Sequence, residues 1–157
     1  MLHVFVVLAA LFLGFFAPVM AIGQAVVVDH QCTDISKIPA QWILAAKQNL
    51  RVGYGHSSHG EQLTTGMEAM KGNPGSLYYF DSSTWGLHPG VFLNVHWGNA
   101  YGLNPDDLGC CGSLLWRDAT VIGLNQPGND RNVVMWSWCG GAGDSDENEI
   151  EVYLNAM

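Results

Sequence analysis

Apolar residues recur at intervals of three or four positions in four segments, and this spacing predicts amphipathic helices. The segments are residues 36–49, 60–70, 114–124 and 144–157. The last segment opens with acidic side chains, which the positive end of a helix dipole favours. The expected N-caps are Ser36 for the first helix and Asp144 or Ser145 for the last.

Short β-branched and apolar runs between these segments predict strands. They occupy residues 25–28, 50–54, 77–80, 91–95 and 133–138, and the last run has the most strongly apolar pattern, that of a buried strand. Strands that alternate with helices are typical of a parallel α/β sheet with helices on both faces. The final helical pattern runs to the last residue, so we expect the sheet to be incomplete at the C-terminus.

Residues 1–21 indicate a secretory signal peptide. Val4–Phe16 is almost unbroken apolar sequence, and Val19-Met20-Ala21 places small residues where a signal peptidase cleaves. We therefore expect residues 22–157 to form one domain that is secreted or periplasmic.

The charge of the exported part limits its possible partners, and its cysteines allow disulfides. The 14 acidic and six basic residues give a net charge of -8, and all of them lie after residue 21. This balance argues against nucleic acid or an anionic membrane as a partner. Export permits disulfides, and we expect one or two among the four cysteines, which are Cys32, Cys110, Cys111 and Cys139.

The most reactive residue types are concentrated directly after the predicted strand at residues 50–54. The sequence His56-Ser57-Ser58-His59-Gly60 brings two hydroxyls and two imidazoles to a strand-to-helix turn. A serine becomes a good nucleophile when an imidazole takes its proton, and strand ends are where parallel sheets bind ligands. The alternative is a turn in which the serines cap a helix and the histidines make local hydrogen bonds.

The His-x-Ser-x-Gly pattern of this turn resembles the first block of divergent SGNH (GDSL-like) hydrolases. The resemblance implies a three-layer, flavodoxin-like α/β fold that cleaves esters. It implies Ser58 as the nucleophile, with Ser57 as the fallback, and a contribution of the Ser58 backbone N–H to the oxyanion hole. His56 and His59 would orient the turn, or one of them would serve as the base.

Later blocks of the family are matched less well. The strand at residues 133–138 lies where the family has Gly-x-Asn-Asp, but Asn129-Asp130 precedes that strand and indicates a turn. The family takes its base from a C-terminal Asp-x-x-His, which this sequence lacks. The resemblance, which also extends to uncharacterised exported bacterial proteins, therefore implies a longer parent chain. The expected substrate-binding residues are Gly55, Gly60, Trp138, Cys139 and Gly140.

Two other functions are open from the sequence. His56 and His59 could ligate a metal ion together with His30, His96 or Asp29, although three separate segments would have to meet. The glycine- and tryptophan-rich loops could instead hold a glycan without catalysis; their tryptophans are Trp85, Trp97, Trp116, Trp136 and Trp138.

Taken together, the residues favour an exported serine esterase that acts on a small ester or an acylated glycan, such as an acetylated polysaccharide. We expect no cofactor and no resident metal ion for this activity. The acidic series Asp144-x-Asp146-x-Asn148 begins like a calcium loop, but Glu149 occupies its glycine position, so it indicates a helix start instead.

Overall fold

The computed structural model describes residues 28–103, 105 and 107–157, which fall into two units, Met1–Ile35 and Ser36–Met157. In the first unit, a turn joins the Cys32 N–H to the Asp29 carbonyl, and a 3₁₀ helix η1 (Ile35–Lys37) leads into the second unit. The predicted signal peptide lies outside the described residues.

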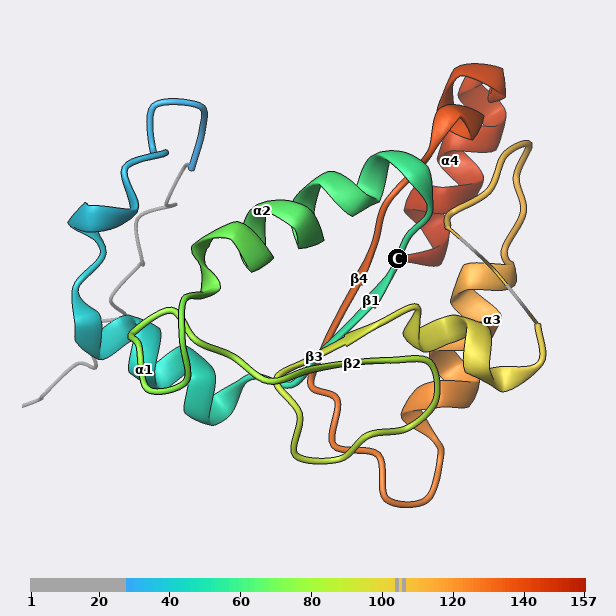
Figure 1. The fold of residues 1–157 in the computed structure, drawn as a ribbon. Helices are drawn as coiled ribbons and strands as arrows, with labels where there is room; N and C mark the ends of the chain where they lie inside the picture. Colours follow the sequence, from blue (N-terminus) through green and yellow to red (C-terminus); the bar gives the residue numbers. More distant parts are fainter. Residues whose placement is uncertain (1–27, 104, 106) are drawn as a thin grey trace, which may run out of the picture. The chain divides into compact units, whose positions relative to one another are not determined.

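Figure 1 shows the helices and strands of the second unit, which are α1 (Ala40–Asn49), β1 (Val52–Gly55), α2 (Glu61–Lys71), β2 (Ser82–Thr84), β3 (Leu93–Val95), α3 (Leu115–Leu124), β4 (Val133–Trp136) and α4 (Glu147–Ala156).

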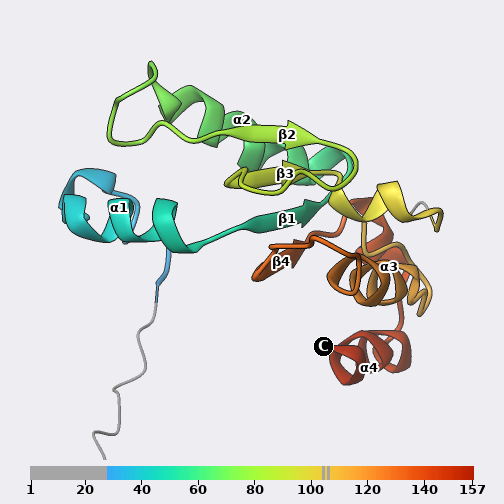
Figure 2. The same ribbon diagram turned by 90° about the horizontal axis from the view of Figure 1, so that it is seen from below.

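The four strands form one parallel sheet in the order β2-β3-β1-β4 (Figure 2). The register aligns Val52 of β1 with Leu93 of β3 and with Val133 of β4. The chain thus leaves β1 for one side of the sheet and later returns to the other side to form β4. In such sheets, ligands bind at the carboxyl ends of the strands where the chain direction switches, which here is beside β1 and β4.

Helices pack on both faces of the sheet. On one face, the side chains of Val52 and Tyr54 form a core with Phe80 and Leu93, and Met67 of α2 packs against it. Successive strand residues point to opposite faces, so the glycines of β1 lie on the other face. The predicted parallel α/β architecture is confirmed at this level.

The second face is covered by η3 (Trp97–Tyr101), α3 and α4. The Trp97 ring is fully buried, and a Cβ on Gly53 would lie 2.9 Å from it. A second core contains Leu108, Trp116 and Tyr153, with the rings of Trp136 and Trp138 packed against it. The absence of side chains on β1 at this face lets large indole rings sit directly on the backbone.

Several element boundaries differ from the sequence prediction. The run at residues 77–80 is not a strand, and β2 forms two residues later at Ser82–Thr84. Pro39, not Ser36, is the N-cap of α1. Asp146 caps α4 in a capping box with Glu149, so the acidic series is a helix start, one residue or two later than expected.

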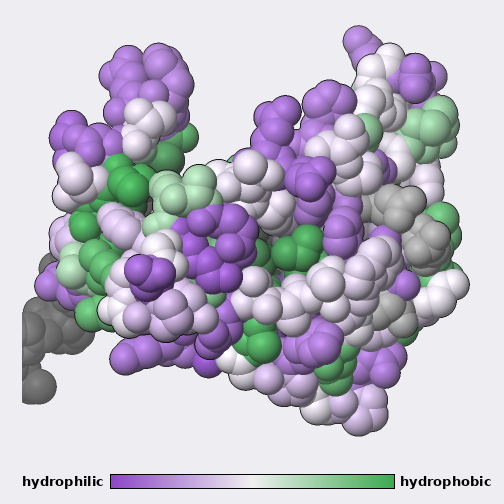
Figure 3. Space-filling model, viewed as in Figure 1, coloured by the Kyte–Doolittle hydropathy of each residue, from purple (hydrophilic) through white to green (hydrophobic). Residues whose placement is uncertain are grey.

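Burial of the last strand was also overestimated. β4 is half-buried or exposed along its length, because it lies at the edge of the described sheet and has a strand partner on one side alone. The apolar side chains of Trp42 and Leu44 on α1, and of Ile38 just before it, are exposed, and apolar surface is visible over this helix in Figure 3. Among the described residues, no helix combines the length and apolar character needed to cross a membrane.

The expected disulfides are not present. All four cysteines are free thiols, and three of them are exposed. Two of the exposed cysteines, Cys110 and Cys111, are adjacent in the sequence. The sulfur of Cys139 faces the ring of His59 instead of another cysteine.

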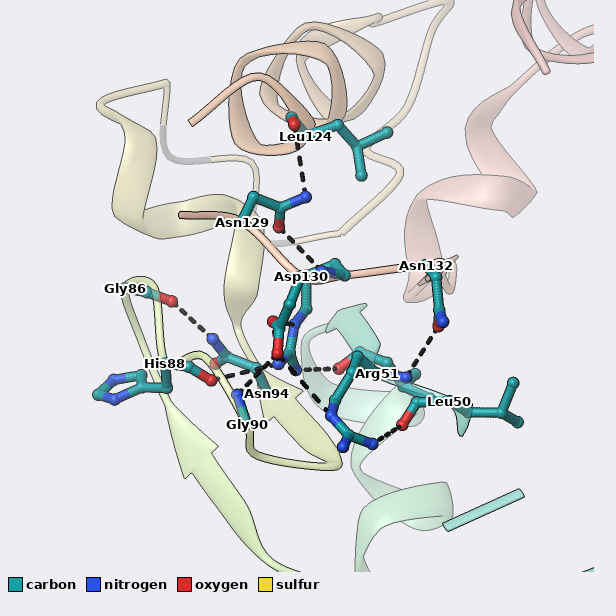
Figure 4. A network of polar contacts seen from close by, with 12 residues as sticks. Leu50, Arg51, Gly86, His88, Gly90, Asn94, Leu124, Asn129, Asp130 and Asn132 are labelled. Atoms are coloured by element: carbon teal, nitrogen blue, oxygen red, sulfur yellow. Dashed lines mark hydrogen bonds and ion pairs between the residues drawn. The ribbon is translucent and has the colours of Figure 1, made fainter. Parts of the chain in front are cut away.

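A buried arginine holds the start of β4. The Arg131 side chain is buried and donates to the carbonyl of Val52 at 3.3 Å and to that of His88 at 3.2 Å. Figure 4 shows the neighbouring His88, Gly90 and Asp130 of this network. Its guanidinium also pairs with the carboxylate of Asp130 at 2.6 Å, and the other oxygen of that carboxylate accepts from the Gly90 N–H. The turn at Asn129-Asp130 thus has a structural role before the amino end of β4, whereas the predicted site lies at the carboxyl ends of the strands.

Candidate functional site

The predicted nucleophile turn lies directly at the carboxyl end of β1. His56 and Ser57 follow the strand, and η2 (Ser58–Gly60) leads into α2. Ser58 is exposed and has a φ of 28°, a positive value that non-glycine residues rarely adopt. A sharp turn of this kind presents the hydroxyl at the end of the sheet, and strained backbone of this kind is common at functional sites.

The end of β4 lies beside this turn. The Ser137 N–H donates to the Gly55 carbonyl at 3.2 Å, which extends the strand pairing by one step. Two residues later, the sulfur of Cys139 lies 3.6 Å from Nδ1 of His59. The structure therefore brings together Cys139 and the Ser58-His59 turn, as expected if both belong to one site.

The environment of Cys139 favours a thiolate. Its pKa is lowered to about 6 by the His59 imidazole first, then by the Gly140 N–H and by the hydroxyls of Ser58 and Ser57. At neutral pH such a thiol is mostly ionised, and the thiolate is the reactive form of cysteine. The sequence suggested substrate binding for Cys139, and the structure shows there a thiol whose pKa is lowered by its neighbours.

The two serines differ in their partners. The Ser57 hydroxyl donates to Oδ2 of Asp107 at 2.5 Å, and Oδ1 of that carboxylate accepts from the Gly109 N–H at 2.6 Å. Leu108 is tied to Ser137 through its N–H. Within the described part of the chain, no hydrogen bond joins a histidine to the hydroxyl of Ser57 or Ser58. Asp107 was missed by the sequence reasoning because it lies in an irregular loop and belongs to no motif.

His56 is a buried neutral imidazole. Its ring stacks on that of Tyr54 with centroids 4.7 Å apart, and it makes a tilted contact with the ring of His96 at 4.8 Å. Burial, and then the nearby His96, lowers its pKa, while contacts with Ser57 and Glu61 act weakly in the opposite direction. Neither ring nitrogen has a hydrogen-bond partner among the described residues. The structure thus separates the two histidines of the motif: His59 faces the site, and His56 is part of the packing.

No protein-family model, curated protein or solved structure matches the chain. Its function has to be inferred from the geometry of this site.

Two of the expected binding glycines are required for packing. Gly55 is buried, and a Cβ on it would overlap the Trp136 ring. Gly60 is also buried; a Cβ there would overlap the Ser137 hydroxyl, and its carbonyl accepts from the hydroxyl of Tyr54 at 3.1 Å. Both glycines therefore allow the turn after β1 to approach the turn after β4 closely.

The other two expected binding residues differ in exposure. Trp138 is half-buried, and its ring makes an edge-to-face contact with Tyr153 at 5.2 Å, so it belongs to the second core. Gly140 is exposed and begins η4 (Gly140–Asp144) beside Cys139. Its N–H is, after His59, the second group that lowers the pKa of the Cys139 thiol.

The metal alternative finds no support in the described residues, where no group of three His, Cys, Asp or Glu side chains is placed to hold an ion. The ring of His56 makes a tilted contact with that of His96, whereas His59 faces Cys139. Asp29 and His30 belong to the other unit, so their place relative to this site is not described.

A pocket with both polar and apolar lining lies next to the turn, between α2 and the edge of the sheet. It has a volume of about 350 Å³ and is lined by His56, His96, carboxylates of α2 and hydroxyls of β2. The exposed ring of Trp85 stacks on His96 at 4.9 Å. Trp97 and Trp116, by contrast, are buried and cannot stack on a sugar as the sequence suggested. Glu61 lines both this pocket and a shallow depression that contains Ser58.

Proposed function

We propose that this chain carries the nucleophile turn of an exported ester hydrolase, with Ser58 as the nucleophile. The observation that supports it most directly is the exposed, positive-φ Ser58 at the carboxyl end of the central strand, beside the end of β4. The four-stranded parallel sheet with helices on both faces agrees with a flavodoxin-like fold of the SGNH type, which we propose as the parent architecture.

The proposed reaction is acyl transfer in two steps. The Ser58 oxygen attacks the ester carbonyl, the alcohol leaves with a proton, and water then hydrolyses the acyl-serine. We assign the proton of the Ser58 hydroxyl to His59, the exposed imidazole at the turn. The resemblance to SGNH hydrolases assigns this role to an Asp-x-x-His, which the sequence does not contain.

We propose an acylated glycan as the substrate class. The pocket beside His56, which shares Glu61 with the depression at Ser58, offers carboxylates and hydroxyls that hydrogen-bond to sugar hydroxyls. The exposed ring of Trp85 offers a flat apolar face. The same pocket favours a second candidate function, which is glycan binding without catalysis.

A fluorophosphonate probe tests the proposal, because it reacts with activated serines. The purified protein is labelled, its intact mass is measured and the adduct is located by peptide mapping. We expect one adduct on Ser58 that is lost in Ser58→Ala. The adjacent Ser57→Ala is the matched control and should label like the wild type.

Labelling of Ser57 instead of Ser58 would contradict the assignment. No adduct on folded protein, together with equal retention of wild type and Ser58→Ala on an acetylated-glycan column, would replace hydrolysis by glycan binding.

A further inference from the structure

We propose that Cys139, paired with His59, is a thiol-modification site that takes small-molecule disulfides. This inference goes beyond ester hydrolysis and does not depend on Ser58 being a nucleophile. It starts from geometry, since the sulfur of Cys139 lies 3.6 Å from Nδ1 of His59 in a turn that follows a different strand.

The sulfur lies among hydrogen-bond donors from two separate segments. His59 and Ser58 belong to the turn after β1, and the Gly140 N–H belongs to the start of η4. Cys139 itself is half-buried. An imidazole beside a thiol draws the proton away, and hydroxyl and amide donors stabilise the resulting negative charge. This is the environment of a reactive cysteine and differs from that of a buried structural one.

Another cysteine of the same chain provides an internal comparison. The pKa of Cys111 is raised to about 11, mainly because it hydrogen-bonds to Cys110, and also by the negative charges of Glu149 and Asp144. The pKa of Cys139 is about 6. Cys111 is the more exposed of the two. Reactivity that followed exposure would favour Cys111, whereas reactivity that followed the thiolate fraction would favour Cys139.

The proposed step is thiol–disulfide exchange with a disulfide such as oxidised glutathione. The Cys139 thiolate attacks one sulfur of the disulfide, a new S–S bond forms, and the glutathione thiolate leaves. The glutathione thiolate that leaves is protonated by the solvent. The disulfide is the oxidant: Cys139 is oxidised to a mixed disulfide, and one half of the reagent is reduced to thiol.

The test measures the modification rate of each cysteine in the full, reduced chain. Protein is mixed with excess oxidised glutathione at pH 7, quenched by acid at intervals and mapped by peptide mass. We expect Cys139 to react faster than Cys111 by about 50-fold, because its larger thiolate fraction outweighs its lower intrinsic nucleophilicity. The Cys139 rate should reach half its maximum near pH 6.

Two variants separate an activated thiol from a merely accessible one. His59→Gln should move the half-maximum to higher pH and slow Cys139 at pH 6 by about threefold or more, after the gain in intrinsic nucleophilicity is counted. The matched control is His88→Gln, which removes an exposed imidazole whose ring contacts the Trp85 carbonyl, and it should leave the profile unchanged. Circular dichroism verifies that each variant is folded.

The proposal is overturned if Cys139 reacts no faster than Cys111, or if folded His59→Gln keeps the wild-type pH profile. If His59→Gln does not fold, the pH profile of wild-type Cys139 decides: a half-maximum near pH 8.5, the ordinary cysteine value, would overturn it.

Discussion

The sulfur of Cys139 lies 3.6 Å from Nδ1 of His59, although 80 positions separate the two residues in the chain. They meet because β1 and β4 pair in parallel, so the segments that follow the two strands emerge at the same edge of the sheet. Gly55 and Gly60 allow these segments to approach closely. This edge therefore combines a serine turn, an imidazole and a thiol.

Modification of Cys139 should block the chemistry at Ser58. Ser58 adjoins His59, whose ring lies 3.6 Å from the sulfur of Cys139, so we expect a glutathionyl group there to occupy the space in front of the serine. We expect fluorophosphonate labelling of Ser58 to slow at least tenfold in the mixed disulfide and to recover after reduction. Cys139→Ser should label at a rate independent of oxidised glutathione; equal labelling of the modified and reduced wild type would show that the two sites are independent.

The two serines should differ in their contribution to stability. Ser57 donates to the half-buried carboxylate of Asp107 at 2.5 Å, whereas Ser58 is exposed. Because hydrogen bonds to charged groups are the stronger ones, Ser57→Ala should lower the free energy of unfolding by about 1.5–3 kcal/mol. Ser58→Ala should change it by about 0.5 kcal/mol or less. Urea unfolding followed by tryptophan fluorescence measures both values, and equal losses would contradict the contact.

Arg131 should be the most important arginine for stability. Its buried guanidinium pairs with Asp130 and donates to two carbonyls, so Arg131→Met would leave these groups without their partner. We expect a loss of about 3–5 kcal/mol in urea unfolding, as for a broken buried ion pair. The control Arg117→Met breaks the exposed pair with Asp118 and should cost at most about 1 kcal/mol. Similar losses for the two variants would refute the special role of Arg131.

Asp130 should make stability fall in acid. Burial alone would raise its pKa, but the Gly90 N–H and then the Arg131 guanidinium outweigh it, and the net pKa lies below the ordinary 3.8. A depressed pKa gives stability that is complete above the ordinary value and is lost as the pH falls through the folded value. Urea unfolding at a series of pH values from about 5 to 2 should therefore show a steeper loss for the wild type than for Asp130→Asn. Parallel curves for the two proteins would argue against this linkage, and Asp118→Asn is the matched control.

Two glycine substitutions should have opposite effects. A Cβ on Gly55 would overlap the Trp136 ring, so Gly55→Ala forces the strands or the indole to move and should cost about 1–3 kcal/mol or more. Gly66 lies inside α2 and a Cβ there meets nothing within 4 Å. Gly66→Ala should therefore raise the free energy of unfolding by about 0.5–1 kcal/mol. Thermal unfolding compares the two variants, and a stable Gly55→Ala would mean that the indole does not lie on the strand.

The helices were the best-predicted elements because their signal is local. Helix α3 begins one residue from its predicted start, and α1 ends at Asn49 as expected. The short strands were less certain, because three or four residues carry little periodic signal. Residues 77–80 have strand-like composition, but the strand forms at Ser82–Thr84, where pairing with β3 is available.

The sequence by itself determined the parallel α/β class, the positions of the main helices and the turn that carries His56-Ser57-Ser58-His59. These features depend on residues a few positions apart, which periodicity and glycine placement report directly. Tertiary structure alone decided that His59 faces Cys139, that Ser57 is held by Asp107, and that His56 is buried between Tyr54 and His96. Those contacts join the ends of different strands or distant loops, so they depend on which strands pair and on which residues are small enough to let the segments meet.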